Sequence, residues 1–315
     1  MIDSIASLLA LSAGADEILI VDQTPKHDDA ALQQLQSWDE TGKIRWVQLT
    51  EPSITKSMNI GLQQASSPLV LFLDDDIVPR GELVAVHRAA HEADLDLWAT
   101  VGQVIQPWQE PEDVDAPREA TGLRIDEDFP FHSTRDMEVQ NVMAGNLCVN
   151  RERTLSIGGF DENFVGAAYR FETEFARRII KSGGSIRFLA SAGIDHLRAE
   201  RGGTRSTGTH LTSADPKHGV GDHYYAMLHA ESAVEARAYC MKRIVREVRT
   251  KFHLTHPWWI PVKLVGEVRA YFAAKRLIQQ KKNSLRMAEE MVTRRVKRGT
   301  ELILIVPRSR VGLPE

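Results

Sequence analysis

The sequence predicts an α/β fold with a mainly parallel, mixed sheet, helices on both of its faces, and a helical extension at the C-terminal end. Two observations predict it. Through residue 105, short apolar runs alternate with stretches of helical periodicity, which is the order of elements in parallel sheets covered by helices. The charge then reverses, because residues 1–236 contain 20 Lys and Arg against 37 Asp and Glu, whereas residues 237–298 contain 17 against 4. Such a split indicates two different surfaces.

The helices of the first part are predicted from apolar residues that recur three or four positions apart, as Ile2, Ile5 and Leu9 do. Turn residues such as Gly183 and Gly184 mark where they end. The predicted helices cover residues 1–13, 29–40, 54–65, 80–92, 151–157 and 172–182.

The strands are predicted from short apolar runs bounded by proline, glycine or acidic residues. The run of residues 68–73 is the most apolar of them and leads directly into three aspartates. Residues 106–136 are rich in proline and acids and lack periodicity, so we expect a surface excursion there. The predicted strands cover residues 17–22, 44–49, 68–73, 97–105, 141–150, 186–189 and 192–196.

The chain divides into three predicted parts. Residues 1–200 form the catalytic domain, and residues 201–222, rich in Gly, Ser and Thr, form a flexible loop that could act as an active-site lid. Residues 223–315 form a basic amphipathic helical region. Within this region we expect helices over residues 224–252, 262–282 and 284–298.

Cysteine usage and hydropathy predict a cytoplasmic protein. Cys148 and Cys240 are too far apart in sequence to indicate a disulfide framework or a zinc site, which fits a reducing compartment. No run of about 18 apolar residues could cross a bilayer. The first residues, MIDSIASLLALSAGADE, carry acids where a secretory signal needs bases.

The run Asp74-Asp75-Asp76 is the strongest candidate for chemistry. Three aspartates at the end of a buried strand repel one another unless a cation or hydrogen-bond donors share the site. Hard oxygen ligands suit Mg²⁺ or Mn²⁺, and ligands of parallel sheets bind at the carboxyl ends of strands. The alternative is an acidic loop that is simply solvated.

Several motifs in order resemble glycosyltransferase family 2 over about residues 1–200. They are the strand ILIVD that ends at Asp22, the segment SMNIG at residues 57–61, the strand LVLFLDDD, the pair Gly145-Asn146 and the turn GGFDE at residues 158–162. The resemblance implies the GT-A fold, a Rossmann-like arrangement, and an inverting transfer of sugar from a nucleotide-sugar donor.

The resemblance also implies donor contacts. Asp22 would contact the base, Lys56 a phosphate and Asp75 the ribose, with Asp74 in a supporting role. The donor would be a UDP-, GDP- or dTDP-sugar, and the acceptor a glycan or a lipid-linked molecule, as in polysaccharide biosynthesis.

The metal and the catalytic base are implied in the same way. Asp76 and His196 would bind Mn²⁺ or Mg²⁺. The family has a Glu-Asp pair at the start of the helix that follows GGFDE, and its carboxylate deprotonates the acceptor. Here the pair is Phe171-Glu172, so we assign the base to Glu172 and keep Glu174 as the second choice.

Two departures from the family leave other functions open. The chain starts in the helix that normally follows the first strand, so that strand is missing from the expected sheet. Together with the Phe171 change, this suggests a catalytically impaired nucleotide-sugar-binding or scaffold protein as an alternative. A haloacid-dehalogenase-like phosphatase is the other, since Asp74-Asp75-Asp76-Ile77-Val78 fits its nucleophile motif, although that motif belongs on a first strand.

The C-terminal region predicts a surface for a partner. Leu264, Val268, Tyr271, Phe272 and Ile278 form an apolar stripe beside several bases, and two tryptophans precede it. We expect peripheral attachment to an anionic inner membrane leaflet. The alternatives are packing on the catalytic domain or oligomer formation through these helices. Nucleic acid is not expected, because the remainder of the chain is strongly acidic.

Overall fold

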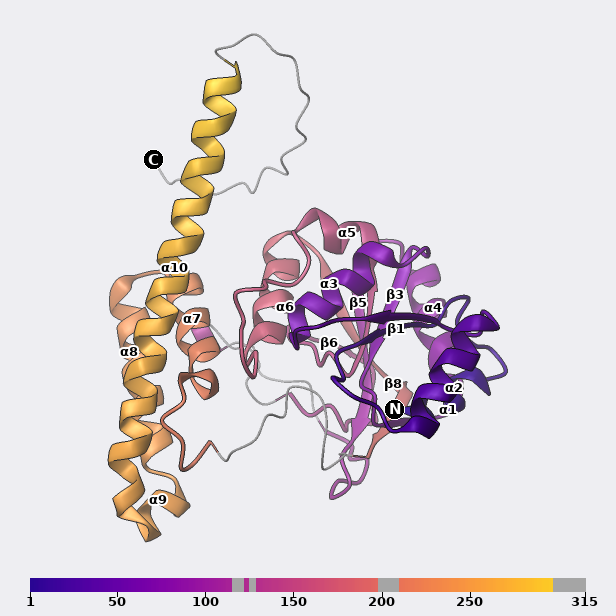
Figure 1. Ribbon diagram of the computed structural model, residues 1–315, viewed down its shortest axis with the longest axis horizontal. Helices are drawn as coiled ribbons and strands as arrows, with labels where there is room; N and C mark the ends of the chain where they lie inside the picture. The colour runs from indigo at the N-terminus through magenta and orange to yellow at the C-terminus, as the bar shows by residue number, and fades with distance from the viewer. Residues whose placement is uncertain (115–121, 125–128, 198–209, 297–315) are drawn as a thin grey trace.

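The computed structural model describes residues 1–114, 122–124, 129–197 and 210–296, with side chains up to residue 281. Figure 1 shows two parts side by side. We name them the sheet lobe, described residues up to 197, and the helical lobe, residues 210–281. All named strands lie in the sheet lobe, and a single long helix runs along the helical lobe and extends beyond it.

A mixed sheet forms the centre of the sheet lobe. Its strand order is β3 (Leu69–Leu73), β7 (Asn146–Asn150), β5 (Leu97–Ile105), β8 (Ser185–His196) and β4 (Ile77–Pro79), and β6 (Met137–Glu138) also pairs with β8. Strands β5 and β8 are parallel, and β7 is antiparallel to both β3 and β5. Strands β3, β5 and β8 therefore point the same way, and their carboxyl ends meet at one edge.

The first two strands form a small sheet of their own. β1 (Leu19–Asp22) and β2 (Arg45–Gln48) are parallel, as the alternation of strands and helices predicts. Among the described residues no backbone pairing joins this sheet to β3. Glu17 lies next to the start of β3 instead, because its carboxylate accepts hydrogen bonds from the backbone N–H and hydroxyl of Ser66 at 3.0 and 2.8 Å.

The helices of the sheet lobe lie close to their predicted positions, because the sequence contains their caps. Asp28, Ser53 and Asn150 each accept a backbone N–H three residues ahead, which satisfies a free donor of the first turn. Only the first helix is clearly shorter than predicted. The helices are α1 (Ile2–Leu9), α2 (Asp29–Glu40), α3 (Ile54–Gln64), α4 (Leu83–Ala93), α5 (Arg151–Ser156) and α6 (Phe171–Lys181).

Aromatic side chains fill the space between the sheet and α6. Phe160 lies 4.4 Å from Phe175 and 5.4 Å from Phe72, measured between ring centroids, and Phe164 lies 5.1 Å from Tyr224 of the helical lobe. Burial of such rings stabilises the fold by a few kcal/mol each, by the ordinary area estimate of about 25 cal/mol per Å². The same core continues into the helical lobe, so the two lobes share one apolar interior.

Three strand predictions need correction. The predicted strands 186–189 and 192–196 form the single strand β8, which has a register shift against β5 between Leu189 and Ile194 rather than a break. The predicted strand 141–150 begins only at Asn146. The three residues of β4 were not predicted as a strand, because a segment this short has no periodicity to read.

The helical lobe also differs from its prediction. The expected helix 224–252 consists of α7 (Val220–His229), α8 (Ala233–Val248) and α9 (Lys251–Thr255), because Ser232 and Thr250 act as N-caps within it. The two helices expected over 262–298 are one helix, α10 (Ile260–Val296). A loop was predicted over residues 201–222. Residues 201–209 lie outside the described part of the chain, and the last three residues of the predicted loop belong to α7. Within the described part, no helix has the length and hydrophobicity of a membrane span.

Candidate active site

The three aspartates follow β3 at the edge where the parallel strands end. The turn that carries them is short, because β4 begins directly after Asp76. Ser4 of α1 holds this turn, because its hydroxyl donates to the carbonyl of Asp75 at 2.8 Å and accepts from the backbone N–H of Ile77 at 3.2 Å. Sequence reasoning gave Ser4 no role, since a serine inside a helix carries no sign of a contact 71 residues away.

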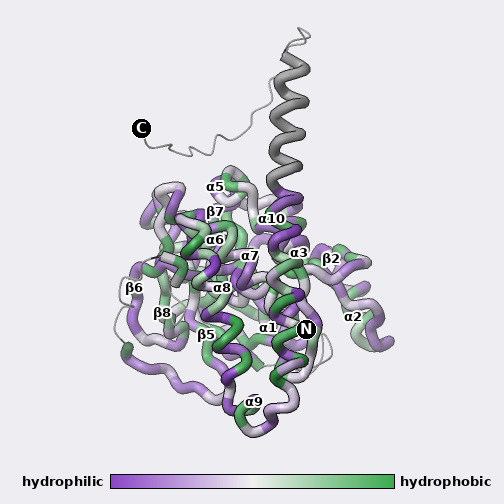
Figure 2. The backbone as a smooth tube through the Cα atoms, turned by 90° about the vertical axis from the view of Figure 1, so that its left-hand side faces the viewer, coloured by the Kyte–Doolittle hydropathy of each residue, from purple (hydrophilic) through white to green (hydrophobic). Residues whose placement is uncertain are grey.

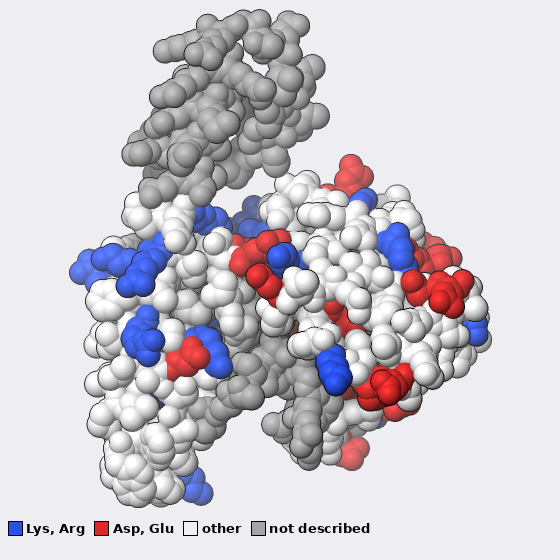
Figure 3. Space-filling view, in the orientation of Figure 1, with Lys and Arg blue, Asp and Glu red and all other residues white. Residues whose placement is uncertain are grey.

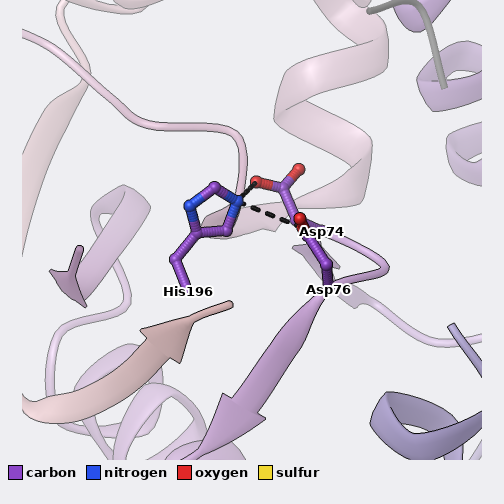
Figure 4. Close-up of side chains that lie close together, drawn as sticks. All are labelled: Asp74, Asp76 and His196. Carbon is purple, nitrogen blue, oxygen red and sulfur yellow. Dashed lines mark ion pairs between the residues drawn. The ribbon is translucent and has the colours of Figure 1, made fainter. Parts of the chain in front are cut away.

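Asp74, Asp76 and His196 form a candidate metal site. Each offers one ligand atom, and the three atoms lie within 4.8 Å of one another. Nε2 of His196 lies 3.1 Å from Oδ1 of Asp76 and 3.6 Å from Oδ2 of Asp74 (Figure 4). The pairing of β4 with β8 explains why His196 and Asp76 lie so close together. Ile77 is opposite His196 in the ladder, and Asp76 is the residue before Ile77.

Gln106 orients the imidazole of His196. Its Oε1 lies 2.9 Å from Nδ1 of His196, so Nδ1 donates in this bond and Nε2 is the ring nitrogen that faces the two aspartates. Two carboxylates and one imidazole nitrogen fit Mn²⁺, and the carboxylates also fit Mg²⁺. Sequence reasoning missed Gln106, although its place directly after β5 was a usable sign.

The glycine at the start of β7 shapes the position of Asp74. The backbone N–H of Asp74 donates to the carbonyl of Gly145 at 3.4 Å, and a Cβ added at Gly145 would overlap Oδ2 of Asp74. Any larger residue here would therefore force the carboxylate of Asp74 to move. The pair Gly145-Asn146 was noted as a motif in the sequence, and the structure supplies the reason for its first member.

Glu172 lies beside the aspartates at the start of α6. Its Oε1 accepts a hydrogen bond from the backbone N–H of Ala144 at 2.6 Å, one residue away from the glycine that contacts Asp74. Burial raises the pKa of Glu172 to about 7, the negative charge of Asp74 adds to the rise, and the bond from Ala144 opposes it. A carboxylate with such a pKa can accept a proton near neutral pH.

Glu174, the second choice for the base, has a different environment. Its two oxygens accept hydrogen bonds from Nε and Nη2 of Arg178, both at 2.8 Å, and His229 lies 3.4 Å away. The side chain is 1% exposed. Burial raises its pKa, but His229 and Arg178 outweigh that effect and lower it. Glu174 is thus held as the carboxylate of a buried ion pair, and the geometry favours Glu172 as the base.

The residues predicted to contact the donor are placed at strand and helix ends. Asp22 ends β1, where its carboxylate accepts from the N–H of Thr24 at 2.8 Å and from the indole of Trp46 at 3.0 Å, with His27 2.6 Å away. Burial opposes ionisation of Asp22, but these bonds outweigh it and lower its pKa. Asp22 is therefore a buried, oriented carboxylate.

Lys56 and Asp75 lie on the surface. Lys56 is exposed in the first turn of α3, and Asp75 is exposed in the turn after β3. Because these two side chains have opposite charges and lie on different elements, they can contact different parts of a bound donor. Their roles in donor binding remain predictions.

The comparisons with known proteins agree with this geometry. The family model described as glycosyl transferase family 2 matches residues 1–142. The crystal structure of GalNAc-T7 with UDP, GalNAc and Mn²⁺ is 16% identical with a TM-score of 0.53, and the similarity covers 71% of this chain and 45% of that chain. The structure of S. aureus TarS 1-349 in complex with UDP-GlcNAc is 13% identical with a TM-score of 0.52, covering 89% and 87%.

No curated protein sequence matches this chain. The chain spans less than half the length of the GalNAc-T7 chain. At such low sequence identities, the similarity to these two structures shows the fold alone. The family model matches the part of the chain that contains Asp22 and the three aspartates. The resemblance to glycosyltransferase family 2 is thereby confirmed over residues 1–142, and the sheet lobe has the GT-A fold.

Proposed function

We propose that this protein is an inverting glycosyltransferase that moves a sugar from a nucleotide-diphosphate donor to a hydroxyl acceptor, with Mn²⁺ or Mg²⁺ as cofactor. The observation that carries the proposal is the meeting of Asp74, Asp76 and His196 with Glu172 at one edge of the sheet. A candidate cation site beside a carboxylate that can accept a proton is the arrangement that this transfer needs. The ligands of the two neighbours, UDP with Mn²⁺ and UDP-GlcNAc, support the same class of donor.

Glu172 would act as the general base. Ala144 holds Oε1, and we assign the other oxygen, Oε2, to the proton of the acceptor hydroxyl. As the hydroxyl attacks the anomeric carbon, its proton passes to Oε2 and the bond from that carbon to the nucleoside diphosphate breaks on the opposite face. Proton transfer of this kind contributes about 10² to 10⁴ to a rate.

The residues at the edge of the sheet would hold the donor. Asp74, Asp76 and His196 would hold the cation, which when bound would offset the charge that grows on the leaving diphosphate. Asp75 would contact the ribose and Asp22 the base, which can be uracil, guanine or thymine. The acceptor is a glycan or a lipid-linked hydroxyl.

A thermal-shift screen with nucleotide sugars tests the donor class. In the presence of Mn²⁺, a UDP-, GDP- or dTDP-sugar should raise the melting temperature, and EDTA should remove the shift. The variant Asp76→Ala should lose the Mn²⁺-dependent binding of the donor. The control Asp96→Ala changes an aspartate whose side chain is fully exposed, and it should behave as the wild type.

Chromatography of the products separates the alternatives. Release of a nucleoside diphosphate from the bound donor supports the transferase, whereas donor binding without release supports a scaffold protein. Release of phosphate from phosphomonoesters, without any donor shift, would support the phosphatase. Inversion is read from the configuration of the product by NMR.

A further inference from the structure

The helical lobe exposes large apolar side chains along several of its helices. We name this surface the outer face; it comprises the exposed side chains of α8, α9, the 3₁₀ turn Pro257–Trp259 and the first part of α10. Trp258 is 65% exposed and Phe272 52%. The exposed apolar residues are Val234, Met241, Val245, Leu254, Trp258, Leu264, Val265, Val268 and Phe272.

The apolar stripe predicted for α10 divides between two sides of the helix. Tyr271 and Ile278 pack against the core, whereas Leu264, Val268 and Phe272 point to solvent. Packing on the catalytic domain therefore accounts for only part of the apolar surface of α10. In Figure 2, α9 lies at the tip of the helical lobe, and hydrophobic residues lie there as well. α8 and α10 pack against each other, so the main parts of the outer face lie on neighbouring helices.

The helical lobe has exposed acids at Asp215 and Glu231, before α8, but from α8 onward its exposed charges are basic. Between residues 232 and 281, every exposed charged side chain is a Lys or Arg. Two of the three acids of this segment face inward, where Glu267 meets Arg243 at 3.0 Å and Lys263 at 3.0 Å, and Glu247 meets Lys263 at 3.3 Å. The third, Glu235, is half-buried and accepts from the backbone N–H of Glu231 at 2.8 Å. The exposed bases are Arg237, Lys242, Arg246, Arg249, Lys251, Arg269, Lys275 and Arg276.

Bases and apolar side chains are mixed within the outer face. A shallow hollow on α8 is lined by Met241 and Val245 together with Lys242, Arg246 and Arg249. Figure 3 shows Lys and Arg on the visible side of the helical lobe, while most Asp and Glu in that view lie on the sheet lobe. A ligand of this surface therefore needs apolar groups and negative charge close together.

A second copy of the chain is a poor occupant for the outer face. Symmetric contact would bring the same bases opposite one another, and like charges brought together across an interface cost several kcal/mol. An anionic lipid surface supplies acyl chains and phosphates at once, and exposed tryptophans such as Trp258 prefer the headgroup region. We infer that the outer face binds a membrane surface that contains anionic lipid.

Flotation of the full chain with vesicles tests this inference, whether or not the protein transfers sugar. In low salt, the chain should float with vesicles of phosphatidylcholine and phosphatidylglycerol and stay below with phosphatidylcholine alone. Binding should fall at 1 M salt, where the screening length drops from about 10 Å at 0.1 M to about 3 Å. Light scattering without lipid records the oligomeric state in parallel.

Two sets of variants identify the face. Charge reversal at Lys242, Arg249 and Lys275 should weaken binding to anionic vesicles at least about tenfold, because each base near the surface contributes to attraction. Reversal of Lys26 and Lys43, which are exposed on the sheet lobe, should leave binding unchanged. Equal losses in the two sets, or equal binding to both vesicle types, would overturn the inference.

The apolar set is tested separately. Trp258→Ala with Phe272→Ala should weaken binding that survives at high salt, whereas Leu95→Ala, at a 79% exposed position of the sheet lobe, should not. The inference is rejected if the double variant floats as well as the wild type. It is also rejected if the chain forms a stable dimer that Phe272→Ala dissociates, because the outer face would then bind a second copy.

Discussion

Arg170, the residue before helix α6, donates from Nε to Oδ1 of Asp222 in helix α7 at a distance of 3.3 Å. Asp222 is fully buried and also accepts from Tyr239 at 2.7 Å and from Arg243. Arg170 has a left-handed backbone with φ of 75°, which an L residue adopts only when its surroundings hold it there. The helical lobe thus holds the turn from which the helix of Glu172 begins.

The first prediction concerns this turn. Arg170→Ala removes the bond to Asp222 but keeps the strained backbone, whereas Arg170→Gly removes both. Both variants should lower kcat about tenfold with donor affinity unchanged, because a small shift of Glu172 weakens proton transfer. The Ala variant should also be about 1 kcal/mol less stable than the Gly variant in urea unfolding. Wild-type kcat in both variants would show that the contact is structural only.

The second prediction concerns Gly145. A Cβ at this position would overlap Oδ2 of Asp74, so Gly145→Ala should displace that carboxylate and weaken Mn²⁺ binding by tenfold or more in calorimetry. Gly61→Ala is the matched control, because its Cβ would meet the ring of Phe72 at an ordinary 3.5 Å within a helix. Equal Mn²⁺ affinity of the two variants would remove Asp74 from the metal site.

The third prediction separates the two glutamates of α6. Glu172→Gln should retain donor binding while transfer falls by about 10² to 10⁴, the size of a general-base effect. Glu174→Gln should instead lower the free energy of unfolding by about 3 kcal/mol, because it leaves Arg178 without its buried carboxylate. Single-turnover kinetics and urea unfolding on the same two proteins give both numbers. The reverse pattern would move the base by two residues.

The fourth prediction concerns acid stability. Glu267 faces His223, Arg243 and Lys263; burial raises its pKa, but these partners lower it from 4.5 to about 2. A lowered folded-state pKa stabilises the protein above the unfolded pKa, and this stability is lost as pH falls from about 4.5 toward 2. Between pH 7 and pH 3, the wild type should lose about 2 kcal/mol more unfolding free energy than Glu267→Gln. Parallel pH profiles would contradict this.

The match between predicted and observed elements depends on their length. Helices with caps and strands with a full apolar run follow local rules, so α2, α3 and β5 lie within about two residues of prediction. The helix boundaries of the helical lobe were less predictable. Ser232 is the N-cap of α8, but the apolar residues on both sides of it recur with one helical period, which predicts an uninterrupted helix. β4 exists only because β8 pairs with it, and pairing between distant segments leaves no local pattern.

The sequence alone determined the α/β class, the aspartates at the end of an apolar strand, and a basic helical region, because all three follow from periodicity and charge. The predicted full burial of that strand was wrong, because β3 is the edge strand of its sheet and its residues are only partly buried. The tertiary structure alone decided which carboxylate sits beside them. Glu172 and Glu174 lie two residues apart in one helix and therefore face different directions, one toward Ala144 and the aspartates, the other toward Arg178. Which direction reaches the site depends on how α6 packs, and packing joins residues that no local pattern connects.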